Sequence, residues 1–411
     1  MFKNHTLLSW LTEASIFCAT FFLPLKTGLS NAGLIGLLAT TLVAFIRYGV
    51  LSVGERPIWG YLKLPWLLFL PLLIGAFYTQ YPENLTGQLS KMIFYLLVPL
   101  VLFRKDLNKN RSIEVAATGL LLGAAVSSVY LLTFNFLEFS EAGTPIRRLL
   151  SYSYTGKKFV SPLPEMHQVY LGSYYLFALV LLWQSKIKAF PLLKWAGTLL
   201  LLTAILFVNS RSILALTALF GVTIVYRILG RNYVLGLIAV AIALFFLATP
   251  FLKDTYVYKK FSDGTLWEFK ENIGTHNTDD EINSDSRMSR WIASWEIYKE
   301  RPLLGYGTGS ARELLLQSYA EKGMQVSFRQ QYDSHNQFLA YAIEFGAPGI
   351  AAILCFFVAN LWVAWRRPDA LLGFFIVMIL VICLTENYLI RNMGINFVAL
   401  WTTILHLKKD D

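Results

Sequence analysis

Three arginines and one histidine in this sequence have both the residue type and the position to bind an anion and transfer a proton. Arg211 lies in the polar turn 209–212, between two long apolar runs. Arg287 and Arg290 lie in a later polar stretch, and their spacing places both on one face of a helix. Guanidinium groups bind phosphate oxygens through paired hydrogen bonds, so these arginines could together hold a phosphate. His335, in the same stretch, could act as a general base.

The residues around His335 favour a neutral imidazole. Asp333-Ser334 is a typical capping pair, so we expect a helix that opens with His335-Asn336 and runs into the membrane. The positive end of that helix dipole disfavours the imidazolium, and a neutral ring can accept a proton. An interfacial histidine that only caps the helix or hydrogen-bonds locally explains the same position.

Each arginine also has a purely structural explanation. Arg211 could extend toward lipid headgroups while its alkyl chain stays in the apolar region. Arg287 and Arg290 could form surface ion pairs with Asp285 or Glu296. The residues alone leave the choice between a phosphate clamp and these alternatives open.

Other polar residues near the apolar runs have simpler explanations. The loop 137–165 carries cations that could steer an anionic lipid-linked substrate, although an exposed polar loop explains them equally well. These cations are Arg147, Arg148, Lys157 and Lys158. His167 is typical of a structural residue at a helix start, and Glu386 and Arg391, which flank the last outward turn, could simply pair with each other. Glu13 is an acidic residue well inside an apolar run.

The composition indicates an integral membrane protein. Apolar residues make up 55% of the chain, charged residues only 15%, and the mean hydropathy is +0.50. Soluble domains carry about a quarter charged residues. The apolar runs are helix-length and uninterrupted, which excludes the alternating strands of an outer-membrane barrel.

About twelve apolar runs are long enough to cross a bilayer as helices. They extend over about 7–25, 29–46, 64–80, 89–103, 113–136, 166–184, 190–208, 212–229, 232–250, 337–364, 370–387 and 392–407. The first run is expected to be a retained span and not a cleaved signal peptide. We therefore predict an all-α membrane protein with spans 1–9 in residues 1–250, a large helical loop at 251–334, and spans 10–12 in residues 335–411.

The basic residues predict the orientation of these spans. Alternate connections are basic, and an even number of spans with both termini in the cytoplasm places every basic group inside. These groups are Arg47, Arg56 and Lys63; Arg104, Lys105, Lys109 and Arg111; Lys186, Lys188 and Lys194; Arg227 and Arg231; Arg366 and Arg367; and Lys408 and Lys409. The net charge of +10 is therefore explained by topology, and we expect no nucleic-acid partner. The Arg211 turn and the loop 251–334 are therefore expected to face the periplasm or exterior.

Helices and a turn are also predicted inside the large loop. The cluster Asn283-Ser284-Asp285 is expected to cap a helix over about 286–300. The segment 305–309 follows as a flexible glycine-rich turn, and a second short helix is expected near 311–321. The turn is not a nucleotide loop, because it lacks the Gly-Lys-Ser/Thr ending.

The sequence contains no metal-binding or cofactor motif. It has no HExxH sequence and no Asp-x-Asp sequence, and Cys18, Cys355 and Cys383 are isolated within apolar runs. We expect neither a metal nor a cofactor.

Several segments resemble the O-antigen ligase/polymerase superfamily. They are Ser210-Arg211-Ser212, Arg290-Trp291, the run Arg301-Pro302-Leu303-Leu304-Gly305-Tyr306-Gly307, His335-Asn336-Gln337-Phe338-Leu339, and Glu344-Phe345-Gly346-Ala347-Pro348-Gly349. The resemblance implies a membrane-embedded glycosyltransferase of the GT-C-like type with one large periplasmic loop. It also implies a location in the bacterial inner membrane, with the active site facing the periplasm.

The resemblance further implies a metal-independent, inverting transfer of a glycan from undecaprenyl diphosphate. In this reading His335 is the catalytic base that activates the acceptor hydroxyl, and Arg211 and Arg290, supported by Arg287, hold the carrier diphosphate. An O-antigen ligase with a lipid A–core acceptor is the leading interpretation. An O-antigen polymerase and a protein O-oligosaccharyltransferase remain open, as does a lipid-linked glycan transporter or flippase from a different class.

Overall fold

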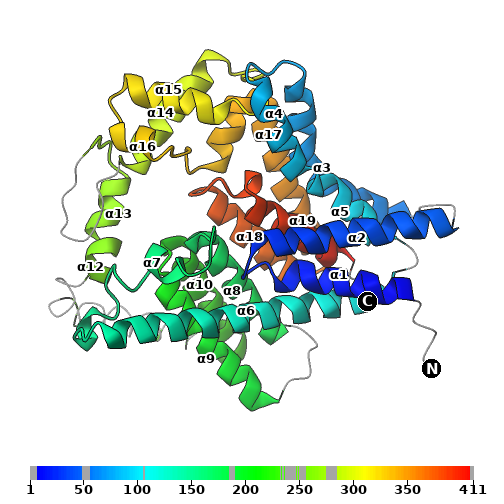
Figure 1. Ribbon diagram of the computed structural model, residues 1–411, viewed down its shortest axis with the longest axis horizontal. Coiled ribbons are helices and arrows are strands. Elements are labelled where there is room, and N and C mark those ends of the chain that lie inside the picture. Colours follow the sequence, from blue (N-terminus) through cyan, green and yellow to red (C-terminus); the bar gives the residue numbers. More distant parts are fainter. Residues whose placement is uncertain are drawn as a thin grey trace.

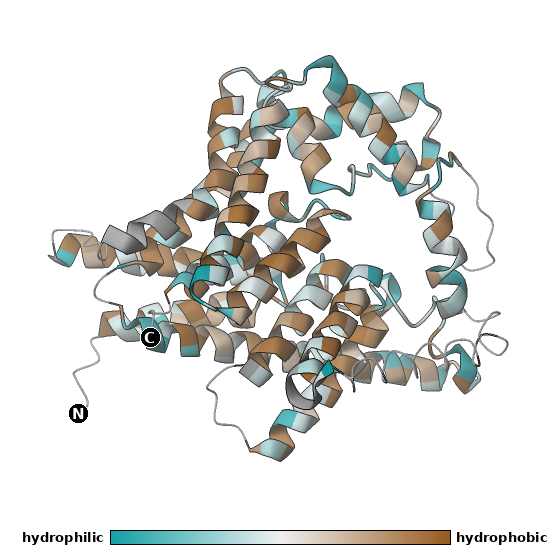
Figure 2. Ribbon diagram, turned by 180° about the vertical axis from the view of Figure 1, so that it is seen from behind, coloured by the Kyte–Doolittle hydropathy of each residue, from teal (hydrophilic) through white to brown (hydrophobic). Residues whose placement is uncertain are grey.

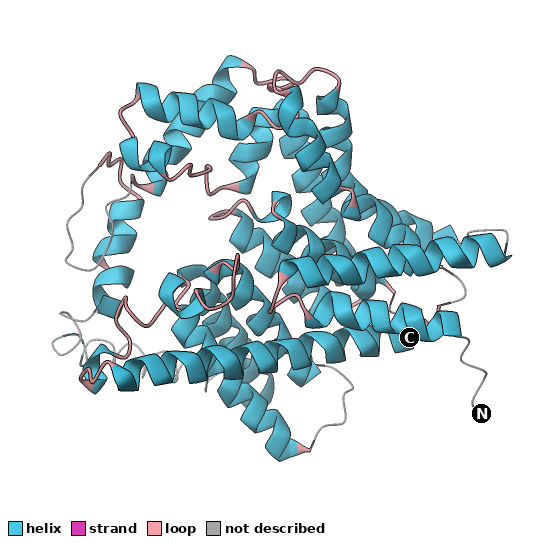
Figure 3. Cartoon of the chain, in the orientation of Figure 1, coloured by secondary structure: helices cyan, strands magenta, loops and turns pink. Residues whose placement is uncertain are grey.

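The structure is a computed structural model that describes residues 7–48, 56–104, 107–184, 190–231, 256–274 and 285–407, with the single positions 233, 236, 247 and 249. Within these residues the regular structure is entirely helical, without strands (Figure 3). The all-α prediction is therefore confirmed for the described part of the chain.

Helices occur at every predicted apolar run that the structure describes. Most of the ninth run, about 232–250, lies outside the described residues. They are α1 (Leu7–Phe21), α2 (Thr27–Tyr48), α3 (Arg56–Ala76), α4 (Pro82–Met92), α5 (Phe94–Leu102), α6 (Lys109–Glu141), α8 (Gln168–Gln184), α9 (Pro191–Val208), α10 (Arg211–Leu229), α17 (Gln337–Arg366), α18 (Ala370–Cys383) and α19 (Asn392–His406). Five spans in the described residues are long and apolar enough to cross a membrane, and the other apolar helices are shorter. The fold is that of a helical membrane protein.

The helix α19 forms the centre of the bundle. Its residues from Gly394 through His406 are all buried, including Trp401. It packs against α5, α3, α2 and α18. A helix that is buried on every side packs against other helices around its whole circumference. α1 begins and α19 ends on the side of the bundle away from α12 and α13 (Figure 1).

Shorter and more hydrophilic helices cover one end of this bundle (Figures 1 and 2). Those from the predicted large loop are α12 (Tyr256–Phe261), α13 (Asp263–Glu268), α14 (Arg287–Glu300), α15 (Ala311–Glu321) and α16 (Gln325–Arg329). Two short turns, η1 (Ile146–Arg148) and α7 (Lys157–Val160), lie in the loop after α6, and η2 (Tyr388–Ile390) lies between α18 and α19. The two predicted loop helices, 286–300 and 311–321, are confirmed as α14 and α15.

The segment 305–309 forms the expected turn, but hydrogen bonds to α17 fix it and it is not a flexible connection. The backbone N–H groups of Tyr306 and Gly307 donate to the carbonyls of Ile343 and Glu344 in α17, at 3.0 and 2.8 Å. The buried Glu344 carboxylate accepts a further bond from the Gly309 N–H at 3.2 Å.

Two glycines allow this close contact. Gly305 (φ +66°) and Gly346 (φ +62°) both have left-handed backbone conformations, and a Cβ on either would lie 2.5–2.6 Å from backbone of the other segment. The turn therefore connects α14 and α15 to α17 at Gly346, where the backbone of α17 departs from helical geometry and forms a kink.

Candidate active site

The helix α14 begins with a cap that sets the direction of its first turn. Ser286 is the N-cap, and its hydroxyl accepts from the Ser289 N–H at 3.2 Å. The neighbouring Asp285 instead holds the surrounding loops, accepting from the N–H groups of Gly274 and Ser327 at 2.9 and 2.7 Å. Arg287 and Arg290 are thereby presented from the first turn of α14.

Arg287 and Arg290 share one carboxylate, that of Glu268 at the end of α13. Its oxygens lie 3.7 Å from Arg287 Nη1 and 3.8 Å from Arg290 Nη2. The predicted alternatives, Asp285 and Glu296, are not the partners found, since Glu296 pairs with Lys322. The common face predicted for the two arginines is confirmed by this shared partner.

Arg290 is the more deeply placed of the two arginines. Its side chain is 5% exposed, and the guanidinium lies 5.1 Å from the ring centre of Tyr332. Arg290 Nε donates to the Ser286 carbonyl at 3.4 Å. These contacts restrict the guanidinium to one orientation.

His335 lies just before α17, and the expectation that it opens the helix is wrong. Its backbone is left-handed (φ +49°), and its N–H donates to the Asp333 carboxylate at 3.0 Å. The N-cap is Asn336, whose side chain accepts from the N–H groups of Phe338 and Leu339. The Asp333-Ser334 pair therefore shapes the turn before the helix and does not cap it.

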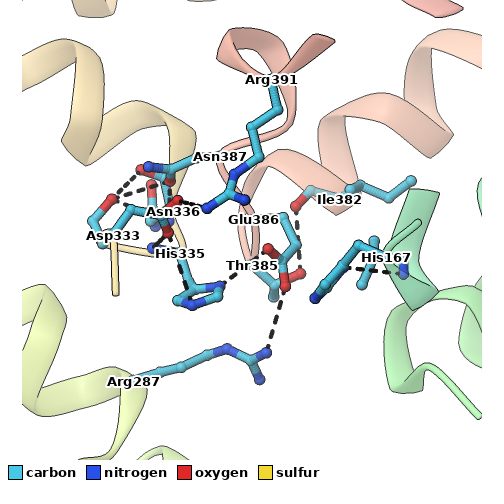
Figure 4. Close-up of polar contacts among 12 residues, drawn as sticks. His167, Arg287, Asp333, His335, Asn336, Ile382, Thr385, Glu386, Asn387 and Arg391 are labelled. Carbon is cyan, nitrogen blue, oxygen red and sulfur yellow. Dashed lines mark hydrogen bonds and ion pairs between the residues drawn. The ribbon is translucent and has the colours of Figure 1, made fainter. Parts of the chain in front are cut away.

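The ring of His335 faces the carboxylate of Glu386. His335 Nδ1 lies 3.0 Å from Glu386 Oε2, whereas Nε2 lies 3.8 Å from the Asp333 carboxylate, which exceeds hydrogen-bonding distance (Figure 4). An ionised carboxylate can only accept, so the neutral ring carries its proton on Nδ1. Nε2 then has a free lone pair, which is the arrangement a general base requires.

Glu386 also connects the histidine with the arginines. Its other carboxylate oxygen lies 3.8 Å from Arg287 Nη2, so Arg287 bridges Glu386 and Glu268. The buried His167 approaches Glu386 from the start of α8 (Figure 4). The expected pairing of Glu386 with Arg391 is wrong, because Arg391 donates to Asp333 at 2.6 Å.

The turn that carries Glu386 is held by hydrogen bonds from several helices. Asn387 Oδ1 accepts from the Asn336 N–H at 2.8 Å and from the Ser334 hydroxyl at 3.1 Å. The Tyr170 hydroxyl of α8 donates to the Asn387 carbonyl, and Gln337 accepts from the Leu389 N–H. The loop of His335 and the turn of Glu386 are thus joined directly, which keeps the pair in register.

The environment of Glu386 favours its ionised form. Burial alone would raise the pKa of this carboxyl, but the charge and hydrogen bond of His335, with the charges of His167 and Arg287, hold the pKa well below its usual range. Burial lowers the pKa of His167. A permanently charged Glu386 stabilises the imidazolium that forms when His335 accepts a proton.

Replacing Glu386 by glutamine is expected to destabilise the fold most at neutral pH. The folded-state pKa lies below that of the unfolded chain, so the charged group stabilises fully above about pH 5, and this contribution is lost as the pH falls toward the folded-state pKa. We expect Glu386→Gln to lower the free energy of unfolding by about 3 kcal/mol at pH 7. The difference should narrow below about pH 4, as measured by denaturant unfolding in detergent. The same loss of unfolding free energy at both pH values would contradict the ionised state assigned to Glu386.

Arg211 is the first residue of α10 and points toward α13. A Cβ on Gly264 would lie 2.9 Å from Arg211 Nη2, so a side chain at this position would collide with the guanidinium. Gly264 and Glu268 are four residues apart in α13 and therefore lie on one face of it. The turn before α10 is held by Lys260 of α12, whose ammonium donates to the Asn209 carbonyl at 2.7 Å.

The helix α13 therefore connects Arg211 with the arginines of α14, and Arg287 connects those with His335. We predict that Arg211, Arg290 and His335 line one cavity. The loop cations Arg147, Arg148, Lys157 and Lys158 are exposed. Within the described residues, no group of three or more His, Cys, Asp or Glu side chains is placed to hold a metal ion.

Sequence reasoning missed the role of three acidic residues. Glu268 ends the short helix α13, which no sequence pattern predicted. Glu386 was assigned to the wrong partner, and its place on the same predicted face as His335 was the available signal. Glu13, considered for a role inside the membrane, pairs with Arg111 at 3.3 Å.

Comparison with known proteins matches the part of the chain that contains most of these residues. A search of the curated proteins found no match. Residues 196–354 match the family model described as O-antigen ligase, and this segment contains Arg211, Glu268, Arg287, Arg290 and His335. This segment of the chain is therefore similar to the O-antigen ligase family.

Proposed function

We propose that the protein is an O-antigen ligase that transfers a glycan from undecaprenyl diphosphate to a lipid A–core acceptor. The observation that carries this proposal is the contact series His335–Glu386–Arg287–Glu268–Arg290, which supports a site built from a base and paired cations. The family match supports a ligase or polymerase reaction on a lipid-linked glycan. The proposed site faces the periplasm of the bacterial inner membrane, with both termini in the cytoplasm.

The proposed reaction is a single displacement. His335 Nε2 takes the proton of the acceptor hydroxyl while that oxygen bonds to the anomeric carbon of the donor. The bond between this carbon and the diphosphate oxygen breaks, the carbon inverts, and the diphosphate leaves with the bonding electrons. Arg287, Arg290 and Arg211 stabilise the developing negative charge through fixed guanidinium groups.

Reconstitution in liposomes tests the proposal directly. Purified protein would receive an undecaprenyl-diphosphate glycan with lipid A–core, with a growing glycan chain, or with a peptide as acceptor. Transfer to lipid A–core alone supports a ligase, whereas transfer to the glycan chain or the peptide supports a polymerase or a protein O-oligosaccharyltransferase. Movement of the donor across the bilayer without a new glycosidic bond would support a transporter.

Transfer is expected to persist in the presence of a metal chelator. The arginines supply the positive charge that a divalent ion provides in other diphosphate-dependent enzymes, so the initial rate with EDTA should equal the rate without it. Loss of activity in EDTA, restored by added Mg²⁺, would count against arginines as the sole clamp.

A further inference from the structure

Glu268 occupies the place between the two arginines of α14 where the proposed function puts a diphosphate. Besides its two ion pairs, Glu268 Oε2 accepts a hydrogen bond from the backbone N–H of Arg287 at 2.8 Å. The N-terminal end of a helix and nearby guanidinium groups together attract anions. The carboxylate therefore satisfies the features that would otherwise bind a ligand phosphate.

The position of Glu268 is fixed by the segment that follows it. Ser286 and Asn272 exchange backbone and side-chain hydrogen bonds of 3.1 and 3.2 Å, joining this segment to the cap of α14. The ring of Phe269 packs against Trp291 at 5.9 Å between centres. Glu268 is thus held at the arginines by neighbours on both chain segments, and its side chain is only 18% exposed.

The arginines keep hydrogen-bonding capacity despite this carboxylate. The separations of 3.7 and 3.8 Å exceed a hydrogen bond, so Glu268 acts on the guanidinium groups through its charge. Arg287 Nε is buried without a hydrogen-bond partner. A ligand with several acceptor oxygens could use these donors, while its charge would be opposed by the fixed carboxylate.

We propose that Glu268 is a built-in competing anion that weakens diphosphate binding and so promotes product release. This inference rests on the proposed function, in which the diphosphate gains negative charge when the glycosidic bond to the carrier breaks. The product would otherwise bind the three arginines more tightly than the donor does. A fixed negative charge at 3.7–3.8 Å from two of them opposes the more highly charged product most.

Binding of inorganic pyrophosphate to the purified full-length protein tests this role. Glu268→Gln keeps an oxygen that accepts from the Arg287 N–H but removes the charge, and we expect it to bind pyrophosphate about tenfold more tightly than wild type. Glu268→Ala removes both the charge and the hydrogen bond. Glu296→Gln is the matched control, because Glu296 lies on α14, the helix that carries both arginines, but pairs with Lys322. It should bind pyrophosphate like wild type.

Turnover supplies a second measurement. In Glu268→Gln the steady-state rate should fall several-fold relative to the rate of that variant's own first turnover, because release is slowed. If the wild-type protein binds pyrophosphate through its arginines but Glu268→Gln binds it equally or more weakly, this inference is overturned. The proposed function then still stands. Failure of wild type and all variants to bind pyrophosphate would overturn both.

Discussion

Replacement of His335 by alanine is expected to lower the transfer rate by about 10³-fold. The reason is the geometry of its ring: Nδ1 is engaged by Glu386 at 3.0 Å, which leaves Nε2 as the acceptor for the hydroxyl proton. A positioned base of this kind can be replaced by water only at a large cost in rate. The measurement is the initial rate of transfer from an undecaprenyl-diphosphate glycan in liposomes.

A control separates the loss of a base from loss of the site. His335 does not contact the arginines directly, so pyrophosphate should bind His335→Ala with the wild-type affinity. Unchanged transfer in this variant would refute the base. Equal loss of transfer and of pyrophosphate binding would show that the histidine supports the fold of the site and does not act in proton transfer.

Replacement of Arg290 by lysine is expected to lower kcat/KM by about 10²-fold. Lysine keeps the positive charge but loses the planar group that packs on Tyr332, and with it the fixed direction of the donors. Arg211→Lys should have a similar effect, because this guanidinium is placed against Gly264 of α13. Both effects should appear in transfer assays and as weaker binding of pyrophosphate.

The matched control for these arginines is Arg312→Lys. Arg312 is exposed on α15 and hydrogen-bonds Gln331, so this variant should transfer glycan at the wild-type rate. If Arg290→Lys and Arg211→Lys also retained full activity, neither residue would belong to a diphosphate clamp. If both variants have the same free energy of unfolding as the wild type, any loss of transfer activity arises in the site.

The long apolar helices could be predicted from the sequence because apolar length is a local property. Each run of sufficient length forms a helix in a membrane, since only a helix satisfies all its backbone hydrogen bonds within one segment. The loop helices α14 and α15 were equally predictable, because capping residues and periodic apolar positions lie close together in the chain. The central position of α19 could not be predicted in this way, since its burial on every side depends on which helices surround it.

Partner choice among charged side chains was the least predictable feature. Glu386 lies 51 residues after His335 and reaches it only because the turn after α18 folds beside the start of α17. Proximity in sequence instead favoured Arg391 for Glu386 and Asp285 for the arginines, and both were wrong. An ion pair forms wherever the chain brings opposite charges together, and sequence distance carries little information about that.

The sequence by itself determined that this is a helical membrane protein, which residues could bind an anion or accept a proton, and which family they resemble. Only the tertiary structure decided how these residues are linked: His335 to Glu386, Glu386 to Arg287, and Arg287 to Arg290 through Glu268. The physical reason is that residue type sets the chemistry a side chain can perform. Its pKa, orientation and partners depend on neighbours that come from distant parts of the chain.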